Sequence, residues 1–409
     1  MKMMKLALLG GAALAVTAAG AQADDLSALK AEIEALNSRV AQLEATPSVP
    51  AGYSLMTVTT GDATVIPGGG DLNVDKGSGK KATIISVLPT ADAPATTTIE
   101  WSGYARAAVV YSHYKYSDGE DSSSSKDLSV PARLQIKVVG KTDTAVGEVG
   151  ASIKLRANFN GEYNPDVYAK EAWGWWAMTP ELTLGGGYTG SLGNIGYGYD
   201  GACNCYYTDN ADVELNPGDT SQIRLTYATG PFTAAVALED ASGGTGGFWS
   251  GDAGFSGNTG SDDSLGVAGE IKYTGDVFNG EISGLWRKAD DSYSNDTYAV
   301  GAGGAFALGD MATISAGAQI GKYRNGTKFW RASILGSVNL SDAVHAEVAY
   351  GHTHHTYYGQ DVNAVLAGIY YDPVSQLTIG LEGEWFKNKG GDVDDVTHYS
   401  ADLVTVFRF

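Results

Sequence analysis

The sequence lacks any long apolar segment beyond its first residues. After residue 23, no run approaches the ~20 apolar residues that a membrane-spanning helix requires. Basic residues are also few, with 27 Lys and Arg against 47 Asp and Glu. This balance argues against nucleic acid as a partner, because nucleic-acid-binding proteins carry basic patches. The chain has 11 prolines and only two cysteines, which are too few for a disulfide-rich scaffold.

The first 23 residues have the pattern of a secretory signal peptide. Lys2 and Lys5 precede an apolar stretch at 6–19, and Ala21-Gln22-Ala23 forms a small-x-small cleavage site. A buried or membrane helix is the alternative, but the stretch is short and rich in Ala and Gly. We expect residues 1–23 to be removed before folding, which takes the formal net charge from −20 to −22.

Residues 24–46 have a helical period that is absent from the rest of the chain. Apolar residues spaced 3, 4, 3, 4 and 3 apart occupy the a and d positions of a coiled-coil seam: Leu26, Leu29, Ile33, Leu36, Val40 and Leu43. A single helix this short is marginal in water, so we expect it to associate with copies of itself. An amphipathic helix packed on its own chain is the alternative. Residues 47–98, rich in Gly, Thr, Ala and Pro, indicate a linker or a small β element.

From residue 99 onward the apolar period becomes two. We expect sixteen strands, at 99–113, 130–140, 147–158, 168–178, 181–189, 220–229, 232–240, 264–273, 278–288, 297–308, 311–322, 327–339, 342–351, 361–371, 375–387 and 396–409. Short turns alternate with mostly longer polar segments such as 114–127, 190–219, 241–263 and 388–395. One end of this meander is therefore plain and the other elaborated.

Several expected strands have an apolar face and a polar face, as in 147–158, where Ile153 and Leu155 alternate with Lys154 and Arg156. A soluble β-sandwich also alternates. Here, however, many strands reach the ~9–11 residues of a tilted membrane strand, against a usual ~5–6. Tryptophans near strand ends resemble interfacial girdles: Trp101, Trp286, Trp330 and Trp385. Strand 168–178 is ambiguous, because Trp173, Trp175 and Trp176 fall on both faces.

A membrane-embedded chain without helices has one way to pair every backbone group. In lipid only helices or closed barrels satisfy all N–H and C=O groups. The sequence therefore predicts an all-β fold, a sixteen-stranded antiparallel transmembrane β-barrel over residues 99–409, preceded by a short coiled-coil helix. The last strand must close against the first, because a barrel has no free edge.

The C-terminal residues "YSADLVTVFRF" keep one apolar face to the end of the chain, as is general in outer-membrane barrels. This face comprises Tyr399, Ala401, Leu403, Thr405, Phe407 and Phe409. The resemblance implies an assembly signal, made by Tyr399, Leu403, Phe407 and Phe409, that the barrel insertion machinery of the outer membrane recognises.

The chain resembles a general porin. The signal peptide, the sixteen strands, the long third loop and the "TVFRF" end carry the resemblance, and the loop "GYDGACNCYYTDNADVELNPGDTSQIRLTY" (198–227) is similar to the alphaproteobacterial porin family. The resemblance covers about residues 99–409. It implies a homotrimeric, water-filled channel in the outer membrane of a Gram-negative bacterium, in contact with its lipid, that passes small hydrophilic solutes and ions by diffusion without a cofactor. Residues 24–98 depart from the plainest porins. Their coiled coil resembles periplasmic extensions that contact peptidoglycan or trimerise.

In porins the third loop folds inward and narrows the channel. The matching segment here is 190–219, and its acids are Asp200, Asp209, Asp212, Glu214 and Asp219. Lumen-facing positions of the early strands carry Arg106, Arg133, Lys137, Lys154, Arg156 and Arg224. If the loop enters the lumen, acids face bases across the narrowest point and set ion preference. The alternative is that these are ordinary solvated charges.

Inward acids on the later strands accompany acidic outer loops, and an acidic vestibule concentrates cations. These inward acids are Glu239, Glu270, Glu347, Glu382, Glu384 and Asp402. We therefore expect weak cation selectivity. Cys203 and Cys205 predict a local disulfide, with free thiols as the alternative, since a zinc site needs two more ligands.

No motif indicates catalysis. The sequence has no nucleophile elbow in a strand-turn-helix context, no H-E-x-x-H and no phosphate loop. His345 and Glu347 are neighbours on one strand, with Ser283 or Ser333 as conceivable partners, but nothing fixes their geometry. The segment "HTHHTYY" (352–358) could bind a transition metal, but it indicates a solvated loop tip. We expect no enzyme and no metal site.

Three other functions stay open. A solute-specific channel has the same fold. A structural protein that ties the outer membrane to peptidoglycan is favoured by the coiled coil. A secreted β-sandwich adhesin would have to be soluble without detergent.

Overall fold

The computed structural model describes residues 56–64, 66, 81–87, 97–118, 121–159, 166–196, 199–208, 218–240, 265–288, 295–323, 326–356, 359–390 and 395–409. The predicted signal peptide and coiled coil lie outside these residues. The chain divides into two compact units, Met1–Leu55 and Met56–Phe409, and every described residue belongs to the second.

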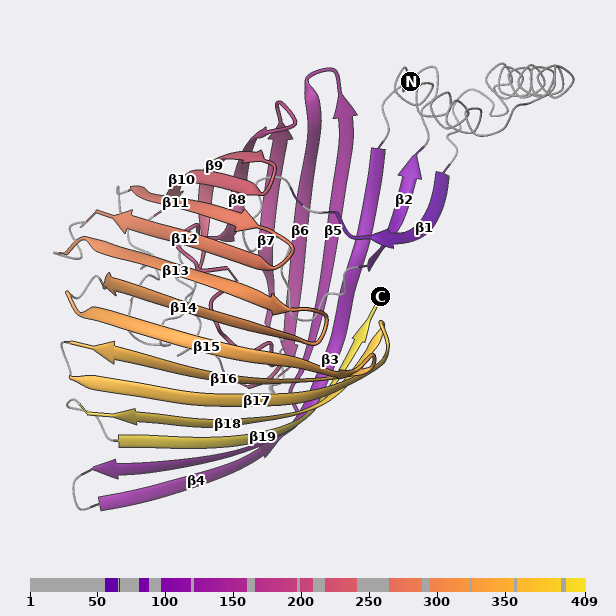
Figure 1. The fold of residues 1–409 in the computed structure, drawn as a ribbon. Helices are drawn as coiled ribbons and strands as arrows, with labels where there is room; N and C mark the ends of the chain where they lie inside the picture. The colour runs from indigo at the N-terminus through magenta and orange to yellow at the C-terminus, as the bar shows by residue number, and fades with distance from the viewer. Residues whose placement is uncertain are drawn as a thin grey trace, which may run out of the picture. The chain divides into compact units, whose positions relative to one another are not determined.

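Sixteen strands of this second unit form a closed antiparallel barrel (Figure 1). In chain order they are β3 (Thr97–Asp118), β5 (Ala132–Thr144), β6 (Gly147–Phe159), β7 (Asp166–Ala177), β8 (Leu182–Gly190), β9 (Asp219–Thr229), β10 (Phe232–Asp240), β11 (Leu265–Thr274), β12 (Phe278–Arg287), β13 (Thr297–Leu308), β14 (Ala312–Lys322), β15 (Lys328–Ser341), β16 (Val344–His355), β17 (Gln360–Val374), β18 (Leu377–Lys389) and β19 (Asp395–Arg408).

The barrel closes where β19 pairs antiparallel with β3, and the other barrel strands pair with their neighbours in chain order. The predicted sixteen-stranded antiparallel barrel is confirmed. Within the described part of the chain, no helix is long and apolar enough to cross a membrane.

The connections define two ends of the barrel. Brief turns such as 145–146 and 178–181 lie at one end, which we call the short-turn end. The first residue of β3 and the last residue of β19 also lie there. The segment 191–218, between β8 and β9, leaves from the opposite, long-loop end.

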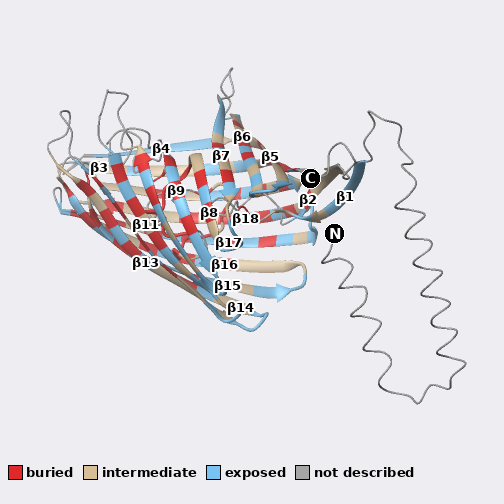
Figure 2. Ribbon diagram, turned by 90° about the horizontal axis from the view of Figure 1, so that it is seen from above, coloured by how far each residue is buried: buried red, intermediate tan, exposed pale blue. Residues whose placement is uncertain are grey.

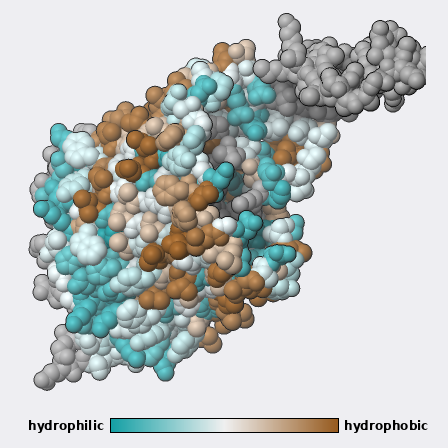
Figure 3. Space-filling model, viewed as in Figure 1, coloured by the Kyte–Doolittle hydropathy of each residue, from teal (hydrophilic) through white to brown (hydrophobic). Residues whose placement is uncertain are grey.

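Alternating exposure along each strand separates an apolar outer face from a polar inner face. In β9, Gln222 and Arg224 are buried, whereas Ile223 and Leu225 are 62% and 41% exposed. Figure 2 shows this alternation as bands of buried and exposed residues along the strands. Apolar residues also gather in patches across the face seen in Figure 3. An exposed apolar face on a closed barrel fits contact with lipid.

The ambiguous tryptophans of β7 divide cleanly between the two faces. Trp173 and Trp175 are 2% and 3% exposed and point inward, and Trp176 is 37% exposed. Trp176 lies next to a turn, and its indole N–H donates to the carbonyl oxygen of Val146 at 2.7 Å.

Aromatic residues gather near both ends of the outer face. Trp286 and Trp330 are 43% and 45% exposed towards the long-loop end. Towards the short-turn end, Tyr273 contacts Phe232 and Phe278, with ring centroids 5.1 and 6.3 Å apart. Two such belts match the interfacial girdles of membrane barrels.

The last strand seals the barrel to its final residue. Leu403, Phe407 and Phe409 are about half exposed on the outer face, at 48%, 55% and 57%. Phe409 exchanges two backbone hydrogen bonds with Gly103 of β3, each 3.1 Å long. A Cβ atom on Gly103 would lie 2.6 Å from the Phe409 ring and 2.4 Å from the carbonyl oxygen of Gln135, so this seam requires glycine.

The polar segment 114–127, predicted as a loop, is mostly strand, so that prediction is wrong. β3 continues to Asp118 and pairs with β4 (Asp121–Ser129). β5 takes over the pairing with β3 after Pro131, whose missing N–H interrupts the ladder. Beyond the membrane both faces of a hairpin contact water, so the apolar alternation that reveals a strand is lost.

A hairpin of β1 (Met56–Asp62) and β2 (Lys81–Val87) precedes the barrel. β2 pairs with the first five residues of β3, Thr97–Trp101, whereas β19 pairs with β3 from Tyr104 onward. The hairpin therefore continues the wall at the short-turn end, where β19 stops.

An arginine on the outer face should destabilise the barrel in proportion to its depth. Ile282, 60% exposed in the middle of β12, and Val277, 55% exposed in the adjacent turn, form a matched pair. We expect Ile282→Arg to cost about 2–4 kcal/mol and Val277→Arg about 0–1 kcal/mol. Urea unfolding in lipid vesicles measures both, and equal losses would contradict a lipid-facing β12.

Candidate functional site

The segment between β8 and β9 lies along the inner wall of the barrel. We call its described residues, 191–196 and 199–208, the inner loop. Its polar contacts reach inward-facing side chains of β10, β12, β14, β15, β16 and β18. Most of its residues are buried. The described part of this third loop therefore lies in the lumen, as the resemblance to porins implies.

Glutamates of the barrel wall hold the backbone of the inner loop. Glu239 of β10 accepts hydrogen bonds from the Leu192 N–H at 3.0 Å and the Ser191 hydroxyl at 2.9 Å. Glu281 of β12 accepts from the Gly196 N–H, with its two oxygens 3.0 and 3.1 Å away. A carboxylate that accepts backbone N–H groups makes charge-assisted bonds, about twice as strong as neutral ones.

The far part of the loop is held in the same way. Glu347 of β16 accepts from the backbone and side-chain amides of Asn204, at 2.8 and 2.6 Å. Glu382 of β18 binds the backbone N–H groups of three consecutive residues, 206–208, at 2.6, 2.9 and 3.1 Å. It also accepts from the hydroxyls of Thr208 and Tyr370, at 2.9 and 3.0 Å. Among the described residues, Glu382 therefore makes the most hydrogen bonds to the loop.

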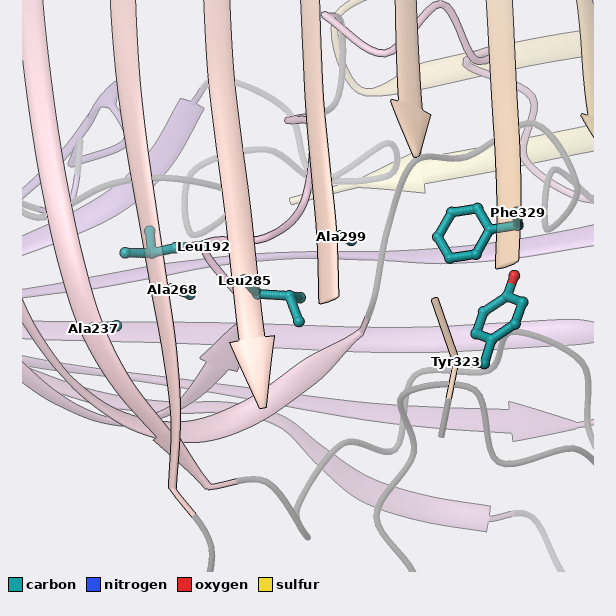
Figure 4. Packing of buried hydrophobic residues seen from close by; sticks show 7 residues of the cluster. All are labelled: Leu192, Ala237, Ala268, Leu285, Ala299, Tyr323 and Phe329. Carbon is teal, nitrogen blue, oxygen red and sulfur yellow. The ribbon is translucent and has the colours of Figure 1, made fainter. Parts of the chain in front are cut away.

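Apolar contacts also hold the start of the inner loop, near Leu192. Leu192, 1% exposed, belongs to a buried cluster that small wall residues and aromatic rings complete: Ala237, Ala268, Leu285, Ala299, Tyr323 and Phe329. Figure 4 shows Leu192 among these residues.

The cysteines lie where the loop crosses β15 to β17. The structure joins Cys203 and Cys205 in a disulfide. Both are buried against an apolar patch of the inner wall that consists of Leu335, Ala349, Ala364 and Leu366. The disulfide and its packing against this patch fix the position of this part of the loop on the wall.

Wall glycines make room for the loop. A Cβ atom on Gly303 of β13 would lie 2.2 Å from the carbonyl oxygen of Tyr199 and 2.6 Å from the side chain of Ile195. Gly201 within the loop has φ +78°, a conformation that glycine adopts at no steric cost.

Three of the predicted bases form a cluster on the inner face of β3, β5 and β6. Arg106 and Arg133 are directly opposite each other, and Arg156 lies one row away, opposite Gln135. The Nε atom of Arg133 donates to Asn158 at 2.6 Å, and that of Arg156 to Gln135 at 2.9 Å. Within the described part of the chain, no carboxylate lies at ion-pair distance from Arg106 or Arg133. This cluster therefore concentrates positive charge.

The inner loop ends against this cluster. The Arg106 guanidinium lies 5.9 Å from the ring of Tyr206 and 4.9 Å from that of Tyr207, within range of cation–π attraction. Burial raises the pKa of Tyr207 to about 12, so its hydroxyl stays protonated and donates to the Arg106 carbonyl oxygen at 3.0 Å. Arg106 is 6% exposed behind these rings, whereas Arg133 and Arg156 are half-buried.

The other predicted bases have separate environments. Lys154 lies 3.6 Å from Glu171. Lys137 and Lys154 are directly opposite each other. Arg224 of β9 donates to the carbonyl oxygen of Gly190, where the loop begins, at 2.9 Å.

Two of the five predicted acids, Asp200 and Asp219, lie within the described residues. The Asp200 carboxylate accepts from the Ala202 N–H at 3.1 Å, within the loop itself. Asp219 forms an ion pair with Lys170, a base that the sequence reasoning did not include. Asp209, Asp212 and Glu214 lie outside the described residues.

Sequence reasoning placed the later glutamates on the inner face but missed their role, and it missed Glu281 altogether. Lys272 bridges two acids of neighbouring strands, lying 3.0 Å from Glu270 and 3.2 Å from Glu281. The inward register of Glu281 in β12 was available from the sequence. Its partner, a backbone N–H, has no sequence signature.

The histidine segment is not a loop tip, because β16 continues to His355. On the outer face, the His352 ring lies 4.8 Å from Trp330, and His354 Nδ1 lies 2.8 Å from Asp361. No group of three His, Cys, Asp or Glu residues in the described ranges is placed to hold a metal ion. His345 lies 3.0 Å from Asp372, and Glu347 holds the loop.

Solved structures with a similar fold are known, although sequence comparisons find no match. No protein-family model matches the sequence, and no curated protein matches it. The structure is similar to the outer membrane channel DcaP of Acinetobacter baumannii, with a TM-score of 0.59 and 15% identity over 79% of this chain and 99% of that chain. It is also similar to the anion-selective porin from Comamonas acidovorans, with a TM-score of 0.53 and 12% identity over 76% of this chain and 100% of that chain. Identities this low show a shared fold alone.

Removing the Glu382 carboxylate should release the far part of the inner loop. Glu382→Ala deletes five hydrogen bonds, and we expect local opening to become easier by at least about 2 kcal/mol, or roughly 30-fold. Limited proteolysis of the folded barrel measures this opening. Glu181→Ala, at an exposed turn, is the control. Equal cleavage of the two variants would contradict the anchoring.

Proposed function

We propose that this chain is an outer-membrane porin of a Gram-negative bacterium, a water-filled channel for passive diffusion of small hydrophilic solutes and ions. The observation that carries the proposal is a closed sixteen-stranded barrel with an apolar outer face, a charged inner face and a loop held against that inner face. Sixteen strands leave an aqueous channel, and the inner loop reduces its width. Because this function rests on diffusion, it requires no cofactor and no catalytic group.

The finer identity follows from the sequence motifs. The Cys-x-Cys loop and the terminal aromatic support membership of the alphaproteobacterial porins, insertion by the outer-membrane barrel machinery through Tyr399, Leu403, Phe407 and Phe409, and assembly as a homotrimer. The heptad seam at 26–43 supports a periplasmic coiled coil. Three barrels joined in one trimer would raise the effective concentration of these helices. Contact of the coiled coil with peptidoglycan is the second role that it supports.

The arrangement of charge favours anions at the narrow part of the pore. Glutamates of the later strands bind loop amides or cations, as Glu239 does with Leu192 and Arg287. Arg133 instead binds a neutral amide and is half-buried at the wall. Most acids of the outer loops lie outside the described residues, and salt screens exposed charges beyond ~8–10 Å. The arginine cluster therefore supports anion preference, opposite to the cation preference expected from composition.

Conductance of the full-length protein in a planar bilayer tests the proposed function. Stepwise openings in groups of three are expected from a trimeric porin. Absence of conductance from folded, inserted protein would contradict an open pore and favour the cell-wall tether. A conductance that one sugar or acid blocks at low concentration would instead favour a solute-specific channel.

Arg133→Ala should shift the reversal potential in a salt gradient towards cations. Loss of one partly screened charge near the solute path is worth about 0.5–1 kcal/mol, so the anion-to-cation permeability ratio should fall about 2- to 5-fold. Lys126→Ala, which removes an exposed lysine of β4, is the control and should change the ratio little. An unchanged ratio in Arg133→Ala would rule out the cluster as the selectivity element.

A further inference from the structure

A short segment after β1 enters the barrel at the short-turn end. We call its described residues, Ala63, Thr64 and Ile66, the strap. Ile66 is 1% exposed and packs in a buried cluster with Val139, Trp173 and Trp175. All three belong to the barrel wall and point inward, so this side chain lies inside the barrel, not on its outer surface.

Inward residues of adjacent strands form the seat of the strap. Glu100 is directly opposite Val139. Val139 is opposite Ser152, and Ser152 is opposite Trp173. Together they make one continuous row across β3, β5, β6 and β7. The neighbouring row, with Lys141 and Trp175, is nearer to the turn between β5 and β6. The strap therefore crosses the wall close to the short-turn mouth.

Polar contacts fix the strap at Thr64. The Thr64 N–H donates to the Glu100 carboxylate at 2.7 Å, and the Thr64 hydroxyl donates to the same carboxylate. Lys141 Nζ donates to the Thr64 hydroxyl oxygen at 2.8 Å and lies 3.8 Å from Glu100. Glu100 is 4% exposed. A buried carboxylate needs such donors, and within the described residues the strap supplies its N–H donor.

The wall is shaped to receive an apolar side chain here. A Cβ atom on Gly150 would lie 2.1 Å from the Trp175 ring, and one on Gly185 would lie 2.1 Å from the Trp173 ring. Both indole rings therefore lie over glycines of the neighbouring strands. Together with Val139 they form an apolar site for Ile66 on the inner wall.

We propose that the strap narrows the short-turn mouth of the pore, so that solute size is limited there as well as at the inner loop. This inference rests on the proposed pore function. In the described residues the strap contacts the wall through Ile66 and Thr64, whereas the inner loop bonds to strands from β10 to β18.

Replacing the buried Ile66 with a charged residue tests whether the strap narrows the pore. Ile66→Asp places a carboxylate among Val139, Trp173 and Trp175 and should expel the strap. Val58→Asp, in the same hairpin at a residue 67% exposed, is the matched control. With full-length protein we expect Ile66→Asp to raise the single-channel conductance, and to raise the liposome-swelling rate for a trisaccharide relative to a pentose. Val58→Asp should behave as wild type. Ile66→Ala serves the same purpose if the aspartate variant does not fold.

The outcomes separate the strap from the pore. If wild type conducts and folded Ile66 variants match it in conductance and in sugar ratio, the strap inference is wrong and the pore stands. If neither wild type nor the folded variants conduct, the pore itself is wrong. Conductance by Ile66→Asp alone would mean that the strap closes the mouth completely, in support of the inference.

Chemical labelling tests whether residue 66 is buried, and it does not depend on conductance. Ile66→Cys and Val58→Cys each add one thiol, and a water-soluble maleimide reports its access. Because a buried group reacts only through local opening, Ile66→Cys should react roughly tenfold or more slowly than Val58→Cys. Equal rates would overturn the inference.

Discussion

The structure depends on one constraint, that a strand in lipid must have every backbone N–H and C=O group paired. The ladder between β19 and β3 meets this constraint, running from Asp395 opposite Ser117 to Arg408 opposite Tyr104, with Phe409 and Gly103 completing it. Closure fixes the tilt and register of all other strands. It also fixes which side chains face lipid, and the inner face is then free to carry charge.

That freedom explains how a long loop can be held inside a barrel. A loop brought against a wall buries amides that a strand would have paired, and each unpaired amide is costly. Glu239, Glu281, Glu347 and Glu382 accept these amides in succession along the wall. The desolvation of each carboxylate is offset by its donors, which are backbone N–H groups together with hydroxyl, amide or cationic side chains. These four glutamates thus hold the loop, whereas the arginines of the early strands carry positive charge on the inner face.

The sequence predicts those parts of the molecule that repeat. Sixteen segments with a period of two, joined by alternating short and long connections, identify the barrel and place residues such as Arg133 and Glu382 on its inner face. It does not reveal that Glu382 binds three consecutive amides, because a backbone N–H is common to almost every residue. β4 escaped prediction because water on both sides removes its apolar face. The strap escaped because three residues carry no period.

The strap and the start of the inner loop both depend on Trp173. The ring of Trp173 packs against Ile66 of the strap, and the Arg224 guanidinium lies 5.2 Å from that ring. Arg224 in turn holds the carbonyl oxygen of Gly190, where the loop segment begins, at 2.9 Å. The ring can lie between them only because Gly185 beneath it has no side chain. A larger residue at 185 would lift the indole from the wall and disturb both contacts, so the shape of this one wall segment supports both the strap and the start of the inner loop.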